Sequence, residues 1–153
     1  MISNVYSSAS GLYVATNLKL ACMEGVEFAL TAHPIRAIKL RAAYTYLSAL
    51  DTSSAIVTRL PRRPRHTLDL DAQWQATAAW LVGTGLYSVS DRVQSATVRL
   101  ENYATVRLYT SYALTSSVAV KFRVENVLNE HYSEVLGYPA LPRAIYSSID
   151  WKF

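Results

Sequence analysis

The chain has 153 residues, enough for one ordinary domain, and 51% of them are hydrophobic. Its longest charge-free run, residues 72–90, contains two glutamines and two glycines, so it would make a poor membrane-spanning helix. The formal net charge is +4, but basic residues are interleaved with acidic ones along the chain. This pattern argues against a nucleic-acid-binding protein.

The residues that usually carry chemistry are sparse. A single cysteine, Cys22, allows no internal disulfide, and it is expected to act as a small apolar residue on a strand. His33, His66 and His131 lie far apart and lack the spacing of metal ligands. No Ser/His/Asp or Cys/His arrangement and no glycine-rich phosphate loop stands out. We therefore expect a protein that is not an enzyme and that holds no cofactor.

Apolar and polar side chains alternate along most of the chain, which is typical of strands with one apolar face. On a helix, at about 100° per residue, the intervening charges would be scattered around the circumference. Eight strands are predicted, several long enough to cross a membrane at a tilt. They cover residues 2–8, 14–32, 35–50, 66–74, 76–89, 103–115, 117–129 and 143–153. The fold class is therefore all-β, an antiparallel transmembrane β-barrel. In strand 76–89 the pattern is less regular, and Trp80, Val82 and Leu86 are assigned to the outer face.

The connections between these strands alternate in length. Residues 32–35, 74–76 and 115–117 are short turns, whereas 51–65, 90–102 and 130–142 are long. Outer-membrane barrels have short periplasmic turns and longer extracellular loops. The pattern predicts three extracellular loops on one rim and a periplasmic C-terminus. The first eight residues do not have the composition of a signal peptide.

The polar face of the predicted strands carries charges of both signs. Either they pair across neighbouring strands and line a wet lumen, or they form a docking surface for a plug or a polar ligand. The first interpretation is favoured, because cross-strand charge pairs are common in sheets. The predicted lumen charges are Lys39, Arg41, Asp69, Asp71, Arg107, Lys121, Arg123, Glu125 and Asp150.

Aromatic residues are abundant, with eleven tyrosines and three tryptophans. They are either ordinary features of β-structure or an interfacial belt at the level of the lipid headgroups. The belt is favoured, because several aromatics fall near strand ends on the apolar face and the chain itself ends on one. These residues are Tyr44, Tyr46, Trp74, Tyr112, Trp151 and Phe153.

Residues 122–139, followed by 143–153, resemble the last hairpin of TonB-dependent outer-membrane receptors, nearest to the cobalamin and siderophore receptor group. Residues 25–30, 44–51 and 60–66 resemble family segments in the same order. Within the hairpin, Asn126 is expected to cap backbone groups where the strand enters its loop. Ser148 departs from the glycine that is frequent at its position in the family.

The resemblance implies an outer-membrane receptor for a scarce ligand such as cobalamin or a ferric siderophore. Family barrels have about 22 strands, so residues 1–153 would be the C-terminal segment of the barrel domain, without the plug. The TonB system would then contact only the plug, outside this chain. The alternative is a complete eight-stranded barrel with a structural or adhesive role, in which the first strand closes on the last.

The resemblance and the loop positions also predict sites. Arg62, Arg63 and Arg65 suit lipopolysaccharide phosphates or an anionic ligand, in a run held extended by Pro61 and Pro64, or else they belong to a solvated loop. The terminal strand is expected to be recognised by the barrel-assembly machinery, and its outer face meets membrane lipid. The ligand-binding candidates are Arg62, Arg63, Arg65, His131, Tyr132 and Tyr138, and the assembly signal is Ile149, Trp151 and Phe153.

Overall fold

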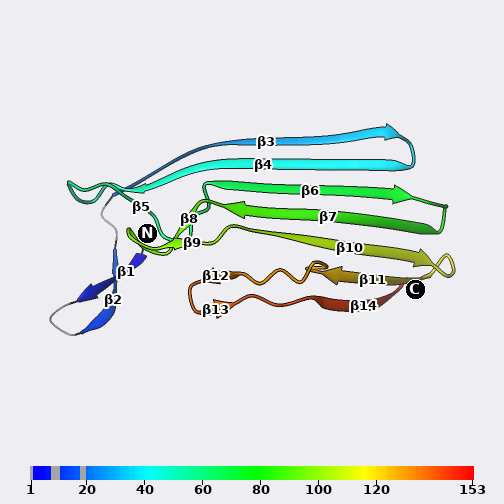
Figure 1. Ribbon diagram of the computed structural model, residues 1–153. Coiled ribbons are helices and arrows are strands. Elements are labelled where there is room, and N and C mark those ends of the chain that lie inside the picture. The colour runs from blue at the N-terminus through cyan, green and yellow to red at the C-terminus, as the bar shows by residue number, and fades with distance from the viewer. Residues whose placement is uncertain (1, 8–10, 18–19) are drawn as a thin grey trace.

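The computed structural model describes residues 2–7, 11–17 and 20–153, and the described part of the chain consists of strands and their connections. In these ranges no helix is long and apolar enough to cross a membrane. The all-β prediction is therefore confirmed. Figure 1 shows long strands running side by side, with small hairpins gathered at one end.

Seven long strands form one antiparallel sheet, in which each strand pairs with the long strands before and after it in the chain. The order across the sheet is β14-β11-β10-β7-β6-β4-β3, and a short strand, β5 (Thr58–Arg59), also pairs with β4. The long strands are β3 (Ala21–Ile35), β4 (Ile38–Asp51), β6 (His66–Gln75), β7 (Trp80–Ser90), β10 (Tyr103–Ala113), β11 (Val118–Glu125) and β14 (Ala144–Trp151).

Three further pairs of strands form small separate sheets. The first is β1 (Ile2–Ser7) with β2 (Leu12–Asn17), which does not join the large sheet that forms the wall of the fold. The predicted strand 14–32 is therefore wrong as a single element, because its first part pairs back onto β1 and its second part belongs to β3. The other two pairs lie within long connections: β8 (Arg92–Val93) with β9 (Arg99–Leu100), and β12 (Ser133–Val135) with β13 (Tyr138–Pro139).

Several predicted boundaries are also corrected. The turn predicted at 32–35 lies at residues 36–37, because β3 continues to Ile35, which pairs with Ile38 at the start of β4. The strand predicted at 117–129 ends at Glu125, because Asn126 has a left-handed backbone with φ of 50°. The strand predicted at 76–89 begins at Trp80. The Thr77 hydroxyl accepts hydrogen bonds from the backbone N–H groups of Ala79 and Trp80, at 3.3 and 3.1 Å, and so forms a turn in the preceding residues.

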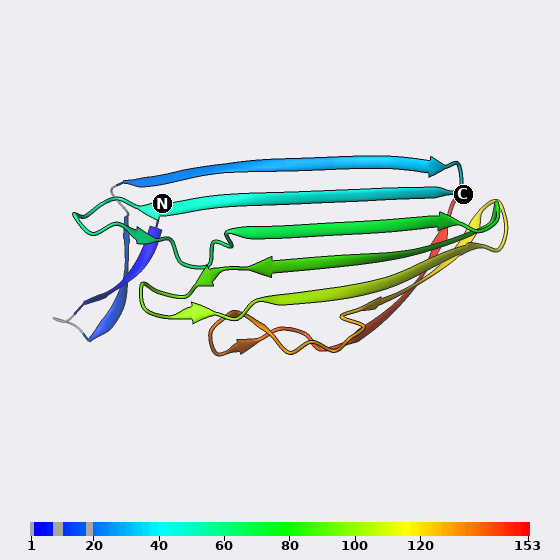
Figure 2. The same ribbon diagram turned by 45° about the horizontal axis from the view of Figure 1, so that its top comes forward.

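The wall is curved but does not close on itself. Strands β3 and β14 lie at its two edges, and Figure 2 shows β14 swinging away from the plane of β3 and β4. Within the described residues β1 pairs with β2 and β14 pairs with β11, so the first strand does not close on the last. This open sheet, a partial barrel, disfavours the alternative of a complete eight-stranded barrel.

The register of the sheet separates an apolar face from a polar one. Leu70 is flanked by Ala42 and Leu86, and Leu86 by Val106. One residue further along β6, Asp71 is flanked by Arg41 and Gly85 on the opposite face. Apolar side chains on the first face remain exposed, for example Phe28 at 60% and Ile149 at 72%. Such a face suits lipid rather than water. The outward assignment of Val82 and Leu86 agrees with their pairing to Trp74 and Leu70.

The two rims differ as the sequence predicts. All three long connections, with their small hairpins, lie at one end of the sheet, and the short turns and the C-terminus lie at the other (Figure 1).

Aromatic side chains lie close to the short turns, namely Trp74, Trp80, Tyr112 and Trp151, and Trp80 is the cross-strand partner of Tyr112. At the other end of β6, the His66 ring and the Tyr44 hydroxyl share a hydrogen bond of 2.7 Å. This placement fits two interfacial belts.

Candidate functional site

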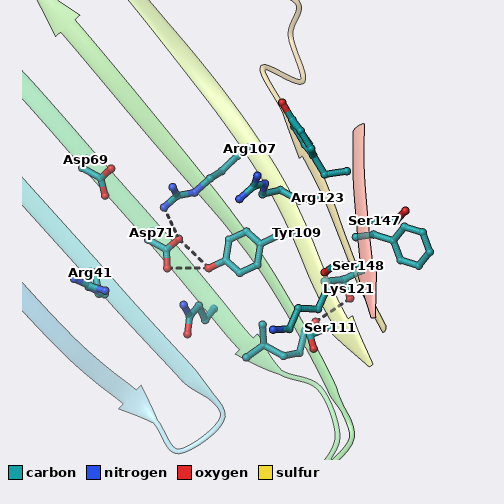
Figure 3. Close-up of a pocket in the computed structure, with 15 residues that line it drawn as sticks. Arg41, Asp69, Asp71, Arg107, Tyr109, Ser111, Lys121, Arg123, Ser147 and Ser148 are labelled. Atoms are coloured by element: carbon teal, nitrogen blue, oxygen red, sulfur yellow. Dashed lines mark hydrogen bonds and ion pairs between the residues drawn. The ribbon is translucent and has the colours of Figure 1, made fainter. Parts of the chain in front are cut away.

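The polar face of the wall is hollowed into a groove of about 950 Å³. Figure 3 shows that side chains from β4, β6, β10 and β11 project into it, with β14 along one side. Several of the predicted lumen charges line this groove together, namely Arg41, Asp69, Asp71, Arg107, Lys121 and Arg123. These six side chains therefore share one face of the wall.

Asp71 is the centre of a hydrogen-bonded cluster in this groove. Its carboxylate is only 9% exposed and accepts hydrogen bonds from the Tyr109 hydroxyl at 2.8 and 2.9 Å. The Arg107 guanidinium donates to the same carboxylate at 3.1 Å. Both donors come from β10, which is separated from β6 by β7. The two side chains therefore reach across a whole strand (Figure 3).

Two glycines in β7 make this crossing possible. A Cβ atom at Gly83 would lie 2.2 Å from Cζ of Tyr109, and one at Gly85 would lie 2.4 Å from Nε of Arg107. Each glycine is the cross-strand partner of the side chain that covers it. The pair of glycines thus leaves a bare strip of backbone over which β10 side chains lie flat against the wall.

The other predicted lumen charges divide into paired and unpaired groups. Lys121 forms an ion pair with Asp150 on the neighbouring strand, and Arg123 Nε lies 3.1 Å from Glu125 on its own strand. Arg123 also stacks over the Tyr146 ring, 4.9 Å from its centroid. Within the described ranges no ion pair reaches Lys39, Arg41 or Asp69. Exposed pairs such as these contribute about 0–1 kcal/mol each.

A second cluster organises the long-loop rim around Asp91. Its carboxylate forms ion pairs with Arg59 at 2.7 Å, Arg65 at 3.1 Å and Arg99 at 3.5 Å. Arg59 also donates to the Asp91 backbone carbonyl, and the Asp91 N–H donates to the Asn102 side chain at 2.9 Å. Asp91 thereby joins the connection 51–65 to the connection 90–102.

The hydrogen bond from Arg59 holds the pKa of Asp91 below its usual range. A lowered folded-state pKa means that the stabilisation is complete above the unfolded-state value of about 3.9. It is lost as the pH falls through the folded-state pKa.

We predict that segments 58–65 and 91–100 exchange amide hydrogens slowly at pH 5–6 and faster below about pH 4, after correction for intrinsic rates. Asp91→Asn should remove this acid dependence, because the neutral amide does not titrate. Hydrogen-exchange mass spectrometry measures both. An acid dependence that is unchanged in Asp91→Asn would contradict the assignment.

Arg92 ties the third long connection to the second. Its side chain is 4% exposed and donates to the backbone carbonyls of Glu101 at 2.9 Å and Ser133 at 3.2 Å. Its guanidinium also stacks on Tyr103, which in turn stacks on Tyr132 with 3.9 Å between ring centroids. Burial raises the pKa of the Tyr132 phenol. This contact chain fixes the connection 126–143 against the rim.

The base of that connection is closed by Asn126, as predicted. Its amide nitrogen donates to the Glu130 carbonyl at 2.9 Å, and its amide oxygen accepts from the Glu130 N–H at 2.8 Å. The side chain of Asn129 accepts from the Arg143 N–H at 3.0 Å, one residue before β14 begins. These two asparagines, both with positive φ, set the start of the terminal strand.

The buried apolar side chains of the described chain also gather at this rim. They lie in the rim segments or at the rim ends of β4, β7 and β10, and none lies in the middle of the wall. The rim is therefore a small packed unit and not a set of free loops. Its core consists of Ala49, Leu60, Val89, Val93, Leu100 and Tyr103.

The six predicted ligand-binding residues fall into two groups. Arg65 and Tyr132 are committed to internal contacts, with Asp91 and Tyr103 respectively. The other four are exposed on the same rim, with Tyr138 at 73%: Arg62, Arg63, His131 and Tyr138. The predicted extended arginine run is wrong, because Arg62 adopts a left-handed φ of 58° and its N–H donates to the Val93 carbonyl at 2.8 Å. A residue directly before a proline is restricted to extended conformations, but Arg62 is followed by Arg63 and is not restricted in this way.

Asp91, Arg92 and Arg59 were missed as organising residues of the rim. They form no recognisable sequence motif, and their partners lie as far as 41 positions away in the chain. No local signal in the sequence marks them.

Comparisons with known proteins agree with this architecture. The TonB dependent receptor-like, beta-barrel family matches residues 1–127. A 56-residue stretch is 36% identical to the vitamin B12 transporter BtuB of Vibrio cholerae, and it covers 37% of this chain but 9% of that transporter.

Solved structures share the fold at low sequence identity. The copper transporter OprC aligns over 99% of this chain with a TM-score of 0.82 and 18% identity, and 26% of its own length is covered. The siderophore receptor PiuA from Acinetobacter baumannii aligns over 87% of this chain, with a TM-score of 0.74 and 17% identity, and is itself covered to 22%. This chain thus spans about a quarter or less of each relative. The match over most of its length shows that the chain belongs to the TonB-dependent receptor β-barrel family.

Proposed function

We propose that residues 1–153 form the C-terminal part of the barrel wall of an outer-membrane TonB-dependent transporter for a scarce ligand of the cobalamin or ferric siderophore class. The family match carries this proposal. The open wall with long connections on one rim supports it, as do the names of relatives that transport vitamin B12 or bind siderophores. The role of this segment is to form wall and rim, and no catalytic step is assigned to it.

The geometry supports a division of roles within the segment. The groove around Asp71 supplies the polar inner surface, where a plug or a passing ligand would contact Arg41 and Asp69. The exposed rim residues Arg62, Arg63, His131 and Tyr138 are the proposed ligand contacts. The TonB system acts through the plug region, outside this segment.

Uptake measurements test the transport function. The gene that carries this chain is deleted in its host, and uptake of radiolabelled cyanocobalamin and of ferric siderophores is compared with the complemented strain. Uptake of one ligand class should be lost on deletion and on dissipation of the proton-motive force. Unchanged uptake of both classes would overturn the proposal. Among rim variants, Arg63→Ala and Tyr138→Ala should raise the KM for uptake, whereas Arg36→Ala at the opposite rim should not.

We propose that the long-loop rim lies outside the cell and the C-terminus in the periplasm, as in barrels with short periplasmic turns and long extracellular loops. Single cysteines at Arg63 and Ser116, in a Cys22→Ser background, report it through labelling of intact cells by a membrane-impermeant maleimide. We expect labelling at position 63 and not at position 116. The reverse pattern would invert the orientation while leaving the fold unchanged.

The terminal strand carries the proposed assembly signal. Ile149, Trp151 and Phe153 lie on the lipid-facing side of β14 or just beyond it, with exposures of 72%, 71% and 111%. Trp151 and Phe153 contact edge to face, with 6.5 Å between ring centroids. Strand addition to the assembly machinery would use the free backbone edge of β14 for affinity and these side chains for selectivity.

Deletion of Phe153 from the full-length protein should lower its outer-membrane level and leave material in the periplasm. The melting temperature of inserted molecules should change little, because the Phe153 ring packs against little besides Trp151. Membrane fractionation and thermal unfolding separate the two effects. A normal membrane level with a large fall in melting temperature would make Phe153 a packing residue instead.

A further inference from the structure

A second cavity, separate from the groove on the polar face, opens at the long-loop rim. It has a volume of about 280 Å³ and lies between β5 and the β8–β9 hairpin. Neither the proposed transport path nor the predicted ligand contacts use it. Its lining residues are Val57, Thr58, Arg59, Val93, Ser95, Ala96, Thr97 and Arg99.

The chemistry of this rim cavity favours an anion. The residues that line it include two arginines, Arg59 and Arg99, and no acidic residue. Three further lining residues carry hydroxyl groups, namely Thr58, Ser95 and Thr97. Guanidinium groups bind oxyanions through charge-assisted and often bidentate hydrogen bonds. Hydroxyl groups add donors that rotate to suit the bound oxygen atoms.

The two arginines are not equivalent. Arg59 is 21% exposed and is held by Asp91, so its position is fixed before any ligand arrives. Arg99 is 81% exposed and lies at 3.5 Å from the same carboxylate, so it is free to turn toward a ligand.

The local charge is also unbalanced. Asp91 is shared by three arginines, Arg59, Arg65 and Arg99, so one negative charge meets three positive ones. Their ordered contacts with Asp91 keep this excess of positive charge in place at the rim. An incoming anion therefore meets a positive field and at least one preorganised donor group.

We propose that this rim cavity binds a phosphate-class oxyanion, with Arg59 as the fixed donor and Arg99 as the closing donor. The phosphate group has two possible sources, a phosphorylated glycolipid headgroup in the surrounding membrane or a free phosphate ion. Both present the same oxyanion to the same residues, and the experiment below distinguishes them.

The test uses the full-length protein in detergent, with inorganic phosphate as the probe and isothermal titration calorimetry at constant ionic strength. Arg99→Gln should weaken phosphate binding about fivefold to tenfold, because a charge-assisted hydrogen bond is lost. Thr97→Val, which nearly preserves shape, should weaken it about threefold. Both substitutions are at exposed positions, so folding should be maintained.

Arg143→Gln is the matched control. It removes one positive charge from an exposed arginine of the same rim that does not line the cavity. It should change phosphate affinity less than twofold. Equal weakening by Arg143→Gln and Arg99→Gln would overturn the proposal, since it would reveal only a diffuse field.

The second arm uses lipid vesicles with bisphosphorylated lipid A or its dephosphorylated form. Stronger, Arg99-dependent binding to the phosphorylated vesicles identifies a headgroup site, and Arg99-dependent binding of inorganic phosphate alone identifies a free-anion site. No saturable binding of either probe would overturn the proposal. The phosphate measurement does not depend on transport, so its failure and a failure of the proposed function are distinguishable.

Discussion

Leu70→Arg should destabilise the inserted barrel by about 2–4 kcal/mol, the range for an arginine on the lipid face near the bilayer midplane. Leu70 lies midway along β6 between His66, near one aromatic belt, and Trp74, near the other. Its neighbours on the same face are Ala42 and Leu86, which offer no partner for a charge. Urea titration of refolding into lipid vesicles measures the change.

Thr105→Arg is the matched control for this substitution. Thr105 pairs with Tyr87, which pairs with Asp69, so it lies at nearly the same depth but on the polar face. Asp69 and Glu125 line the same small polar pocket and would accept the new charge. The cost should stay below about 1 kcal/mol, as expected for exposed polar sites. Equal losses in the two variants would contradict the assignment of the faces.

Substitution of the β7 glycines should release the donors of Asp71. A methyl group at Gly83 would occupy the place of the Tyr109 ring, and one at Gly85 would displace the Arg107 guanidinium. Because Asp71 is only 9% exposed, each lost donor leaves a buried carboxylate poorly satisfied. We expect Gly83→Ala or Gly85→Ala to destabilise the barrel by about 1–3 kcal/mol.

A double-mutant cycle isolates this mechanism from any general effect of alanine on the strand. Gly85→Ala should cost much less in an Arg107→Ala background, because no guanidinium remains to be displaced. Gly83→Ala should likewise cost little beside Tyr109→Ala. Additive losses in both cycles would show that the glycines matter for the backbone alone.

The faces and rims of this protein were predictable because they depend on local patterns. Alternation with period two placed Leu70 and Asp71 on opposite faces, and connection lengths placed residues 63 and 116 at opposite ends. The rim cluster was not predictable, because Asp91 meets Arg59 and Arg65 only after two separate connections fold onto each other. The role of Gly83 and Gly85 was also hidden, since it depends on which β10 side chains lie opposite them. The single strand predicted at 14–32 was wrong because β2 pairs with β1, although the alternating pattern continues into β3.

The location of the buried side chains has a consequence for how the protein responds to its surroundings. The wall leaves its apolar face exposed, as suits a lipid environment, whereas the rim buries apolar side chains of its own, among them Leu60, Val89, Leu100 and Tyr103. Bilayer thickness should therefore govern the stability of the wall. The stability of the rim should instead follow the temperature and urea dependence of apolar burial from water. The wall and the rim of one chain therefore depend on different solvents.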